Sequence, residues 1–248
     1  MNVWKARLGD HISLAFGLLQ RFRAPGCRVL MYHAIGGEVT GDHYGLYSLA
    51  PDRFASHVRC LARMPDAVDL KAGVAAGRGL AITFDDGYRD TFTVAAPLLI
   101  AAKLPFTVFV TPDFVASGSS QYLSRAALRE LSRLPGVTIG AHGRSHRRLT
   151  QCNDNELIDE LAGSRAWLED LLSRPIDTMS YPHGGVDARV RSAVASAGFA
   201  VAACSRFGSH CQNDDPLRVP RTDIWACDGT ARLHSKSAGN WDWMGWRA

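Results

Sequence analysis

Apolar runs rich in β-branched residues alternate with amphipathic stretches along most of the chain. The strand-like runs cover residues 28–33, 80–84, 106–110, 136–141, 177–181 and 199–204. The helix-like stretches cover residues 89–103, 124–134, 153–172 and 187–197. Short strands joined by helices of about 10 to 20 residues are typical of a mostly parallel sheet buried between helices. The pattern predicts an α/β fold, either an open sheet or a barrel, and no Ser/Pro-rich linker divides it.

The first 25 residues have a helical pattern of their own. Apolar side chains recur there at steps of three and four, at Trp4, Leu8, Ile12, Ala15, Phe16, Leu19 and Phe22. Asp10 and His11 interrupt the apolar run, which is shorter than the roughly 20 residues of a membrane span, and no small-residue cleavage site follows. We expect an amphipathic helix over residues 1–25, no signal peptide, and a cytoplasmic location.

The last 20 residues are rich in tryptophan. Trp241, Trp243 and Trp246 are half of the six tryptophans in the chain. We expect this tail, residues 229–248, to cover the underside of a single α/β domain, residues 26–228, together with the first helix. The alternative is an interfacial patch that makes peripheral contact with the inner face of the membrane, because tryptophans and basic amphipathic helices suit the lipid headgroup region.

Composition excludes some classes of function. Apolar residues make up 46% and charged residues 21% of the 248 residues, which are ordinary values for a globular domain. The net charge of +4, from 28 basic and 24 acidic residues, is too small to indicate binding to nucleic acid. Six cysteines without a CxxC pair indicate neither a zinc ribbon nor a disulfide framework. Nothing in the sequence indicates an oligomeric state.

Polar groups follow four of the predicted strands at the point where each strand ends. His33 follows the first strand, Asp85 and Asp86 the second, residues 142–146 the fourth, and residues 182–185 the fifth. In barrels and open sheets of parallel strands, functional residues collect at the carboxyl ends of the strands. We therefore expect these groups to meet at one rim of the sheet.

The residue types at this rim point to metal chemistry. His142 and His146 are four positions apart, so on a helical turn they face the same side and could share one ion. A carboxylate from another strand, with Asp86 as the natural candidate, would leave one position of a tetrahedral site open, as catalytic sites require. Asp85 would then be available to take a proton from a water molecule. A divalent cation would also offset the repulsion between two adjacent carboxylates.

Each of these features also has a structural explanation. An Asp-Asp-Gly sequence after a strand often forms only a turn with a helix cap, and surface helices carry HxxxH pairs by chance. His33 could be a histidine satisfied at the edge of the core, and the Pro-Gly-rich stretch 182–185 is typical of a tight loop. Their conjunction at strand ends is what favours a catalytic site.

The sequence resembles a known family at three motifs. TFDDGY at 83–88, HGRSH at 142–146 and YPHGG at 181–185 resemble the first three motifs of the polysaccharide deacetylases, also called the NodB-homology or carbohydrate esterase family 4 domain. The resemblance extends over about residues 28–225. It implies a distorted (β/α) barrel with fewer than eight repeats. It also implies a metal-dependent hydrolase that removes an N-acyl group, usually acetyl, from an amino sugar.

The resemblance assigns roles to the residues of the first two motifs. It implies that Asp85 is the general base and that Asp86, His142 and His146 ligate a divalent metal, with zinc as the favoured ion. The expected partner is an N-acetylated amino-sugar glycan or glycolipid, and the predicted process is the biosynthesis of a cell-envelope glycan.

The third motif implies an oxyanion contact. It includes Tyr181, Pro182 and His183, and His183 occupies the position whose backbone N–H is expected to hold the oxyanion, where the family usually has Tyr or Phe. The family motif often begins with an arginine that orients the base, but this chain has Ser180 there. We expect Arg221, in the sequence RVPRTDIW, to take that role.

Two histidines, His33 and His234, are candidates for the general acid. The family expects a late Leu-x-His, and His234 in ARLHSKS resembles it, but no strand-like run precedes that position. His33 ends a clear strand in VLMYHAI, similar to the amino-terminal YH motif of a circularly permuted subgroup that resembles the deacetylases of biofilm poly-N-acetylglucosamine. We therefore predict His33 as the acid.

Two further functions fit the sequence. One is a catalytically silent carbohydrate-binding domain on the same barrel, a reading that the missing arginine at position 180 favours slightly. The other is an amidohydrolase acting on a different N-acyl substrate, such as a formylated sugar. Metal-dependent release of acetate would distinguish the leading function from the silent domain, and the chemistry of the pocket would distinguish it from the other amidohydrolases.

Overall fold

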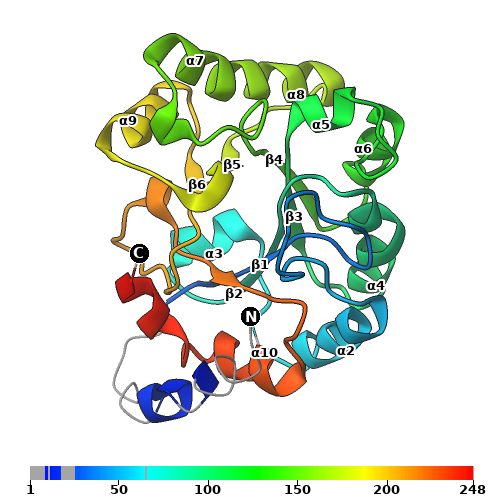
Figure 1. Ribbon diagram of the computed structural model, residues 1–248, viewed down its shortest axis with the longest axis vertical. Coiled ribbons are helices and arrows are strands. Elements are labelled where there is room, and N and C mark those ends of the chain that lie inside the picture. Colours follow the sequence, from blue (N-terminus) through cyan, green and yellow to red (C-terminus); the bar gives the residue numbers. More distant parts are fainter. Residues whose placement is uncertain (1–8, 11, 18–25, 65, 248) are drawn as a thin grey trace.

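In the computed structural model, seven parallel strands form one curled sheet (Figure 1). The strands are β1 (Arg28–Tyr32), β2 (Leu80–Phe84), β3 (Phe106–Val110), β4 (Val137–Ala141), β5 (Thr178–Ser180), β6 (Val201–Ala203) and β7 (Thr222–Asp223). Their order is β6-β5-β4-β3-β2-β1-β7. A bridge between Ala203 and Val219 links β6 to the segment that leads into β7. The predicted distorted (β/α) barrel with fewer than eight repeats is confirmed.

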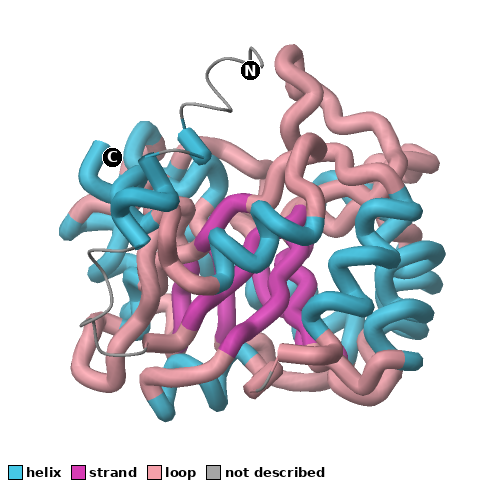
Figure 2. Tube along the Cα trace, turned by 90° about the horizontal axis from the view of Figure 1, so that it is seen from below, coloured by secondary structure: helices cyan, strands magenta, loops and turns pink. Residues whose placement is uncertain are grey.

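The structure describes residues 9–10, 12–17, 26–64 and 66–247. Its helices after β1 are α2 (Pro51–Leu61), α3 (Leu70–Ala76), α4 (Ala96–Ala101), α5 (Pro112–Ala116), α6 (Arg125–Leu131), α7 (Asp154–Ile158), α8 (Ser164–Leu172), α9 (Ala188–Ser196) and α10 (Thr230–Ser237). Two short π-helical segments, η1 (Thr91–Ala95) and η3 (Asp159–Gly163), precede α4 and α8. The 3-10 segments are η2 (Leu149–Gln151), η4 (Pro182–Gly184), η5 (Pro216–Arg218) and η6 (Asp242–Arg247). Figure 2 shows the strands inside and the helices outside.

The central strands are buried on both faces. Every residue of β1, β2 and β3 is buried, which agrees with their uninterrupted apolar sequences. Aromatic rings join these strands to α2: the ring centroid of Tyr32 lies 5.4 Å from that of Phe84 and 5.5 Å from that of Phe54. Phe106 packs edge-on against Phe84 at 5.9 Å. This packing fixes the strand ends from which the polar side chains project.

The described parts of the two termini pack together. Residues 9–10 and 12–17 are helical, and the other residues of the expected helix 1–25 lie outside the described part of the chain. Trp243 donates from Nε1 to the hydroxyl of Ser13 at 2.9 Å, and both segments lie at the same side in Figure 1. Trp241 packs edge-on against Trp225, which follows β7.

The tail is tied to the sheet by buried charges. Arg28, the first residue of β1, donates from both Nη atoms to Asp242 at 2.6 and 3.1 Å. Lys236 of α10 is fully buried and donates to Asp228 at 2.6 Å, with its ammonium 3.5 Å from the ring centre of Trp225. The described residues of the tail thus contact the first residue of β1 and the segment after β7, and the expectation that the tail covers the underside of the barrel stays a prediction. None of the described helices has the length and apolar character needed to cross a bilayer.

Candidate active site

A pocket of about 480 Å³ opens at the carboxyl ends of the strands. Its walls carry polar side chains from the ends of β1, β2, β4 and β7 and from the loop after β5, namely His33, Asp85, Asp86, His142, His146, Tyr181, His183 and Asp223. Met31, Tyr47 and Tyr88 contribute less polar surface. The prediction that the strand-end groups of the sequence meet at one rim is therefore confirmed.

Three of these side chains converge on one point. A carboxylate oxygen of Asp86 lies 3.3 Å from Nε2 of His142 and 3.2 Å from Nε2 of His146. One ligand atom from each of the three residues lies within 4.8 Å of the others. Asp86 has a φ of 72° and Gly87 a φ of 76°, so the chain turns sharply after β2. This turn brings the side chains of adjacent residues 85 and 86 into one pocket, as we expected.

The HxxxH pair does not lie on a helical turn, which corrects our expectation. His142 directly follows β4, and residues 143–148 form a loop. Gly143 and His146 have φ values of 64° and 63°, so the loop folds back through two left-handed residues. The ring centroids of His142 and His146 are 5.0 Å apart. The shared face therefore comes from a folded loop and not from helical periodicity.

The three residues fit a divalent cation. The Oδ1 atom of Asp86 is buried and has no hydrogen-bond partner among the described residues. Nδ1 of His142 lies 3.0 Å from the carbonyl oxygen of Ser180. When Nδ1 donates to that carbonyl, Nε2 presents its lone pair toward Asp86. Two imidazole nitrogens and one carboxylate oxygen around a common point are a donor set that zinc accepts.

Electrostatics at Asp86 favour a negative charge. Burial would raise the pKa of Asp86, but its contacts with His142 and His146 outweigh this effect and hold the pKa well below the usual range. The carboxylate is therefore ionised at neutral pH. An ionised ligand is the form that binds a metal ion.

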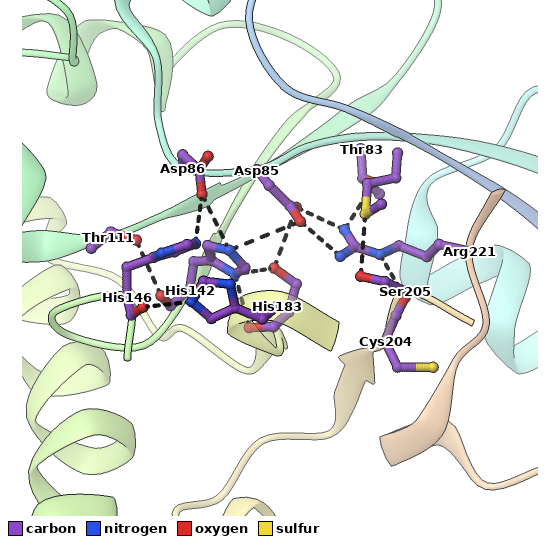
Figure 3. A network of polar contacts seen from close by, with 12 residues as sticks. Thr83, Asp85, Asp86, Thr111, His142, His146, His183, Cys204, Ser205 and Arg221 are labelled. Atoms are coloured by element: carbon purple, nitrogen blue, oxygen red, sulfur yellow. Dashed lines mark hydrogen bonds and ion pairs between the residues drawn. The ribbon is translucent and has the colours of Figure 1, made fainter. Parts of the chain in front are cut away.

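Asp85 faces a buried arginine instead of the cluster. Arg221 donates from Nη1 and Nη2 to the two oxygens of Asp85, each at 2.7 Å, and has no exposed surface. Asp85 lies between Arg221 and His142 in Figure 3, with its Oδ2 4.0 Å from Nε2 of His142. Burial raises the pKa of Asp85, yet Arg221 outweighs it and lowers the pKa overall. Ser180, which occupies the usual arginine position, donates to Asp85 at 3.3 Å.

His33 lies in the pocket and His234 does not. The ring of His33 packs on Tyr47 at 4.6 Å, and its buried Nδ1 has no hydrogen-bond partner within the described chain. His234 is on the exposed face of α10 and lines a separate pocket beside α2 with residues such as Arg59. The structure thus brings only the first of the two candidate histidines to the rim.

Sequence reasoning missed one acidic residue of the pocket. Asp223 ends the two-residue strand β7, and its Oδ2 accepts a hydrogen bond from Nε1 of Trp225 at 2.8 Å. Burial raises the pKa of Asp223, with a smaller opposing effect from His33. The strand has only two residues and shows no pattern, so no local signal in the sequence marks Asp223.

The third motif forms one wall of the pocket. Tyr181 is buried and donates from its hydroxyl to the Leu217 carbonyl at 2.7 Å. His183 adopts a φ of 59°, and its ring packs at a tilt against that of His146, with centroids 4.6 Å apart. Pro182 is buried. Tyr181 and His183 therefore line the pocket, while Pro182 shapes the turn that places them.

Comparison with known proteins agrees with this geometry. The model of the polysaccharide deacetylase family matches residues 73–202, more than half of the chain and a span that holds Asp85, Asp86, His142 and His146. The chain belongs to the polysaccharide deacetylase family. YxkH of Bacillus subtilis, whose name assigns it provisionally to these deacetylases, is 24% identical over 143 residues, which are 58% of this chain and 50% of YxkH. The chain thus spans about half the length of this relative.

Solved structures of polysaccharide deacetylases share the fold of this family member. The deacetylase PplD of Streptococcus pyogenes, solved in complex with acetate, has a TM-score of 0.77 at 20% identity, covering 86% of this chain and 99% of PplD. IcaB of Ammonifex degensii has a TM-score of 0.73 at 20% identity, covering 87% of this chain and 98% of IcaB. These similarities concern the barrel as a whole.

Proposed function

We propose that the protein is a metal-dependent hydrolase that removes an N-acetyl group from an amino sugar in a glycan or lipid-linked glycan. One observation carries the proposal. Asp86, His142 and His146 converge within 4.8 Å, and Asp85, held by Arg221, stands beside them without joining the cluster. Three residues are thus placed to bind a metal ion, while the carboxylate of Asp85 stays outside the ligand set and can act as a base, as metal-assisted hydrolysis requires.

The chain divides the work between ligands and base. Asp86, His142 and His146 would hold a divalent cation, zinc by preference, which supplies Lewis-acid polarisation of the acyl oxygen. Asp85 accepts the proton of the water that attacks the acyl carbon. Arg221 keeps Asp85 ionised and in place, because both carboxylate oxygens accept from one rigid guanidinium.

A second group is needed when the carbon–nitrogen bond breaks. The amine of the sugar leaves with a proton, and we assign that donation to His33, whose Nδ1 is buried without a partner among the described residues. Asp223 lines the same pocket as His33. Water and the N-acetyl sugar supply all the atoms of acetic acid and the free amino sugar, and the proton that Asp85 takes from the water replaces, over the cycle, the proton that His33 gives to the leaving nitrogen.

The loop after β5 offers a backbone donor for the oxyanion. Tyr181 N–H donates to Ala203 and Gly184 N–H donates to Tyr181, while Pro182 has no N–H. The N–H of His183 is the one that these contacts leave for a developing negative charge on the acyl oxygen. Its φ of 59° turns this peptide at the pocket wall.

Three observations support an N-acetylated sugar as the substrate class. The family model matches the stretch that carries the cluster, and the PplD structure with the same fold was solved with acetate. A pocket of about 480 Å³ is of the size that small ligands occupy. These observations support an N-acetylated sugar as the group that enters the pocket.

The test is acetate release from a panel of N-acetylated mono- and oligosaccharides. We expect the zinc-loaded protein to release acetate from at least one of them. Treatment with a chelator should abolish release, and added zinc should restore it. Release that continues unchanged after complete metal removal would contradict the proposal, as would binding of the sugars with no release at all.

A further inference from the structure

A second pocket of about 480 Å³ adjoins the catalytic one. The two pockets share His183 and Ser205 in their linings, so they are neighbours across one wall. The second pocket continues past the third motif along Gly184 and Gly185 and reaches Arg206 and Arg218. A substrate bound in the catalytic pocket can therefore extend into it.

Neither arginine in this lining has a carboxylate partner of its own among the described residues. The side chain of Arg206 makes no hydrogen bond and no ion pair within the described part of the chain. The carboxylate oxygen nearest to Arg218 belongs to Asp215, at 4.0 Å from Nε. Both oxygens of Asp215 already accept from Arg191 at 3.0 Å. The guanidinium of Arg218 thus has most of its donors available.

A third guanidinium lies beside the same pocket. A Cβ at Gly185 would lie 3.6 Å from Nη1 of Arg148, and Arg148 also has no carboxylate partner among the described residues. Gly185 has an ordinary φ of −78°, so its backbone does not require glycine. The missing side chain instead leaves space between Arg148 and the pocket. We call the Gly184–Gly185 loop with Arg148, Arg206 and Arg218 the arginine pocket.

The arginines of this pocket differ from those that pair closely with an acid, as in Arg144–Asp159, Arg165–Glu169, Arg189–Asp154 and Arg191–Asp215. The lining of the arginine pocket contains no carboxylate. Guanidinium groups bind phosphate and carboxylate through paired N–H donors, and this binding is strongest where no internal acid competes.

We infer that the arginine pocket binds an anionic group, phosphate or carboxylate, that the substrate carries next to the amino sugar. This inference rests on the proposed function, because it places the N-acetyl group in the adjoining pocket. It makes the substrate an acidic glycan or a glycosyl phosphate in preference to a neutral homopolymer of N-acetylglucosamine.

Three substrates that all carry N-acetylglucosamine but differ in charge test the inference. They are a neutral chitin oligosaccharide, an oligosaccharide that alternates N-acetylglucosamine with glucuronate, and N-acetylglucosamine joined through diphosphate to a short prenyl chain. We expect kcat/KM for acetate release to be at least about tenfold higher for one anionic substrate, a difference of about 1.4 kcal/mol. Preference for glucuronate identifies a carboxylate ligand, and preference for the diphosphate identifies a phosphate ligand.

Two double variants test whether the arginine pocket causes the preference for an anionic substrate. The double variant Arg206→Gln, Arg218→Gln should lower the ratio of anionic to neutral kcat/KM about tenfold, mainly through KM. The matched control is Arg59→Gln, Arg63→Gln, which removes the same charge beside α2 and α10 and should keep the wild-type ratio. Equal kcat/KM on all three substrates, or a ratio that the first double variant leaves unchanged, overturns the arginine pocket and leaves the proposed function intact.

A binding measurement separates the two proposals. If none of the substrates releases acetate, the proposed function fails, and calorimetric titration with inorganic pyrophosphate and with glucuronate still tests the pocket. Binding that the Arg206→Gln, Arg218→Gln variant loses and the control keeps supports the pocket. Absence of binding to both anions overturns it.

Discussion

Arg221 and Asp85, separated by 136 positions in the chain, form a buried two-point ion pair with both N–H···O distances at 2.7 Å. The guanidinium is held in turn: its Nε donates to the carbonyl of Cys204 at 3.0 Å, and it lies 5.6 Å from the ring centre of Phe109. The pair connects the segment after β6 to the end of β2 (Figure 3). The ion pair therefore holds these two segments of the barrel together and also fixes the position of Asp85, the candidate base.

Removing Arg221 should destabilise the fold. In Arg221→Met, the carboxylate of Asp85 stays buried without its partner, and breaking a buried ion pair in this way costs about 3–5 kcal/mol. Urea unfolding should show this loss, and acetate release should fall as well. The double variant Arg221→Met, Asp85→Asn should recover part of the stability but none of the activity. An Arg221→Met protein as stable as the wild type would contradict the role of the pair.

Asp85 and Asp86 should respond differently to the same change. Of the two, only Asp86 belongs to the candidate metal site, so Asp86→Asn should lose bound zinc. Asp85→Asn should keep zinc, and its acetate release should fall by roughly a hundredfold or more, as loss of a general base does. Zinc content after dialysis and acetate release are measured on the same samples. Asp170→Asn, on the exposed face of α8, is the control that should keep both. Loss of zinc in both site variants would place Asp85 among the ligands.

The sequence predicted the fold where burial leaves a strong pattern. Strands β1, β2, β3 and β4 are nearly continuous apolar runs because both faces of the sheet are covered. The helix α2 was missed because His57 stands in its buried face, where Phe54, Val58 and Leu61 complete the apolar stripe. The two residues of β7 are too few to form any pattern. Local periodicity thus fails where a buried position is polar or an element is very short.

The candidate site was predictable in its residues but not in its local conformation. Asp85, Asp86 and the HxxxH pair follow strands, and parallel strands deliver their carboxyl ends to one rim. The sequence could not show that His142 and His146 lie on a loop, since Gly143 permits a backbone that the four-residue spacing does not indicate. Contacts between distant segments, such as Asp223 beside His33, leave no local signal.

Substitution of the two histidines that are candidates for the general acid should affect turnover differently. His33→Gln should lower turnover by roughly a hundredfold or more and keep zinc, because His33 lies in the pocket outside the metal cluster. His234→Gln should keep full turnover, since His234 lies on the exposed face of α10. Turnover and zinc content are compared for both variants. A loss of turnover confined to His234→Gln would reverse the assignment.

Stability should fall on mild acidification, in part through His57. This side chain has no exposed surface, its Nδ1 lies 3.1 Å from the Tyr32 hydroxyl, and its Nε2 lies 2.9 Å from the Asp228 carbonyl. Burial lowers the pKa of His57 below its ordinary value of 6.5, against a smaller raising effect of Asp228. Below about pH 6.5, the unfolded chain therefore binds a proton that the folded chain does not.

The free energy of unfolding, measured in urea between pH 7.5 and 5.5, should consequently decrease as the pH falls. His57→Gln should be less stable at pH 7.5 by about 1–3 kcal/mol, because the buried partners Tyr32 and Asp228 lose part of their hydrogen bonding. Its stability should also depend less on pH. The remaining dependence includes His183 and His210, whose pKa values burial also lowers, and His142, whose pKa burial would lower but Asp85 and Asp86 raise overall, and which therefore acts in the opposite direction. The exposed His43 provides the control, since His43→Gln should keep the wild-type slope. A His57→Gln slope equal to that of the wild type would mean that His57 takes up its proton equally in the folded and unfolded chains.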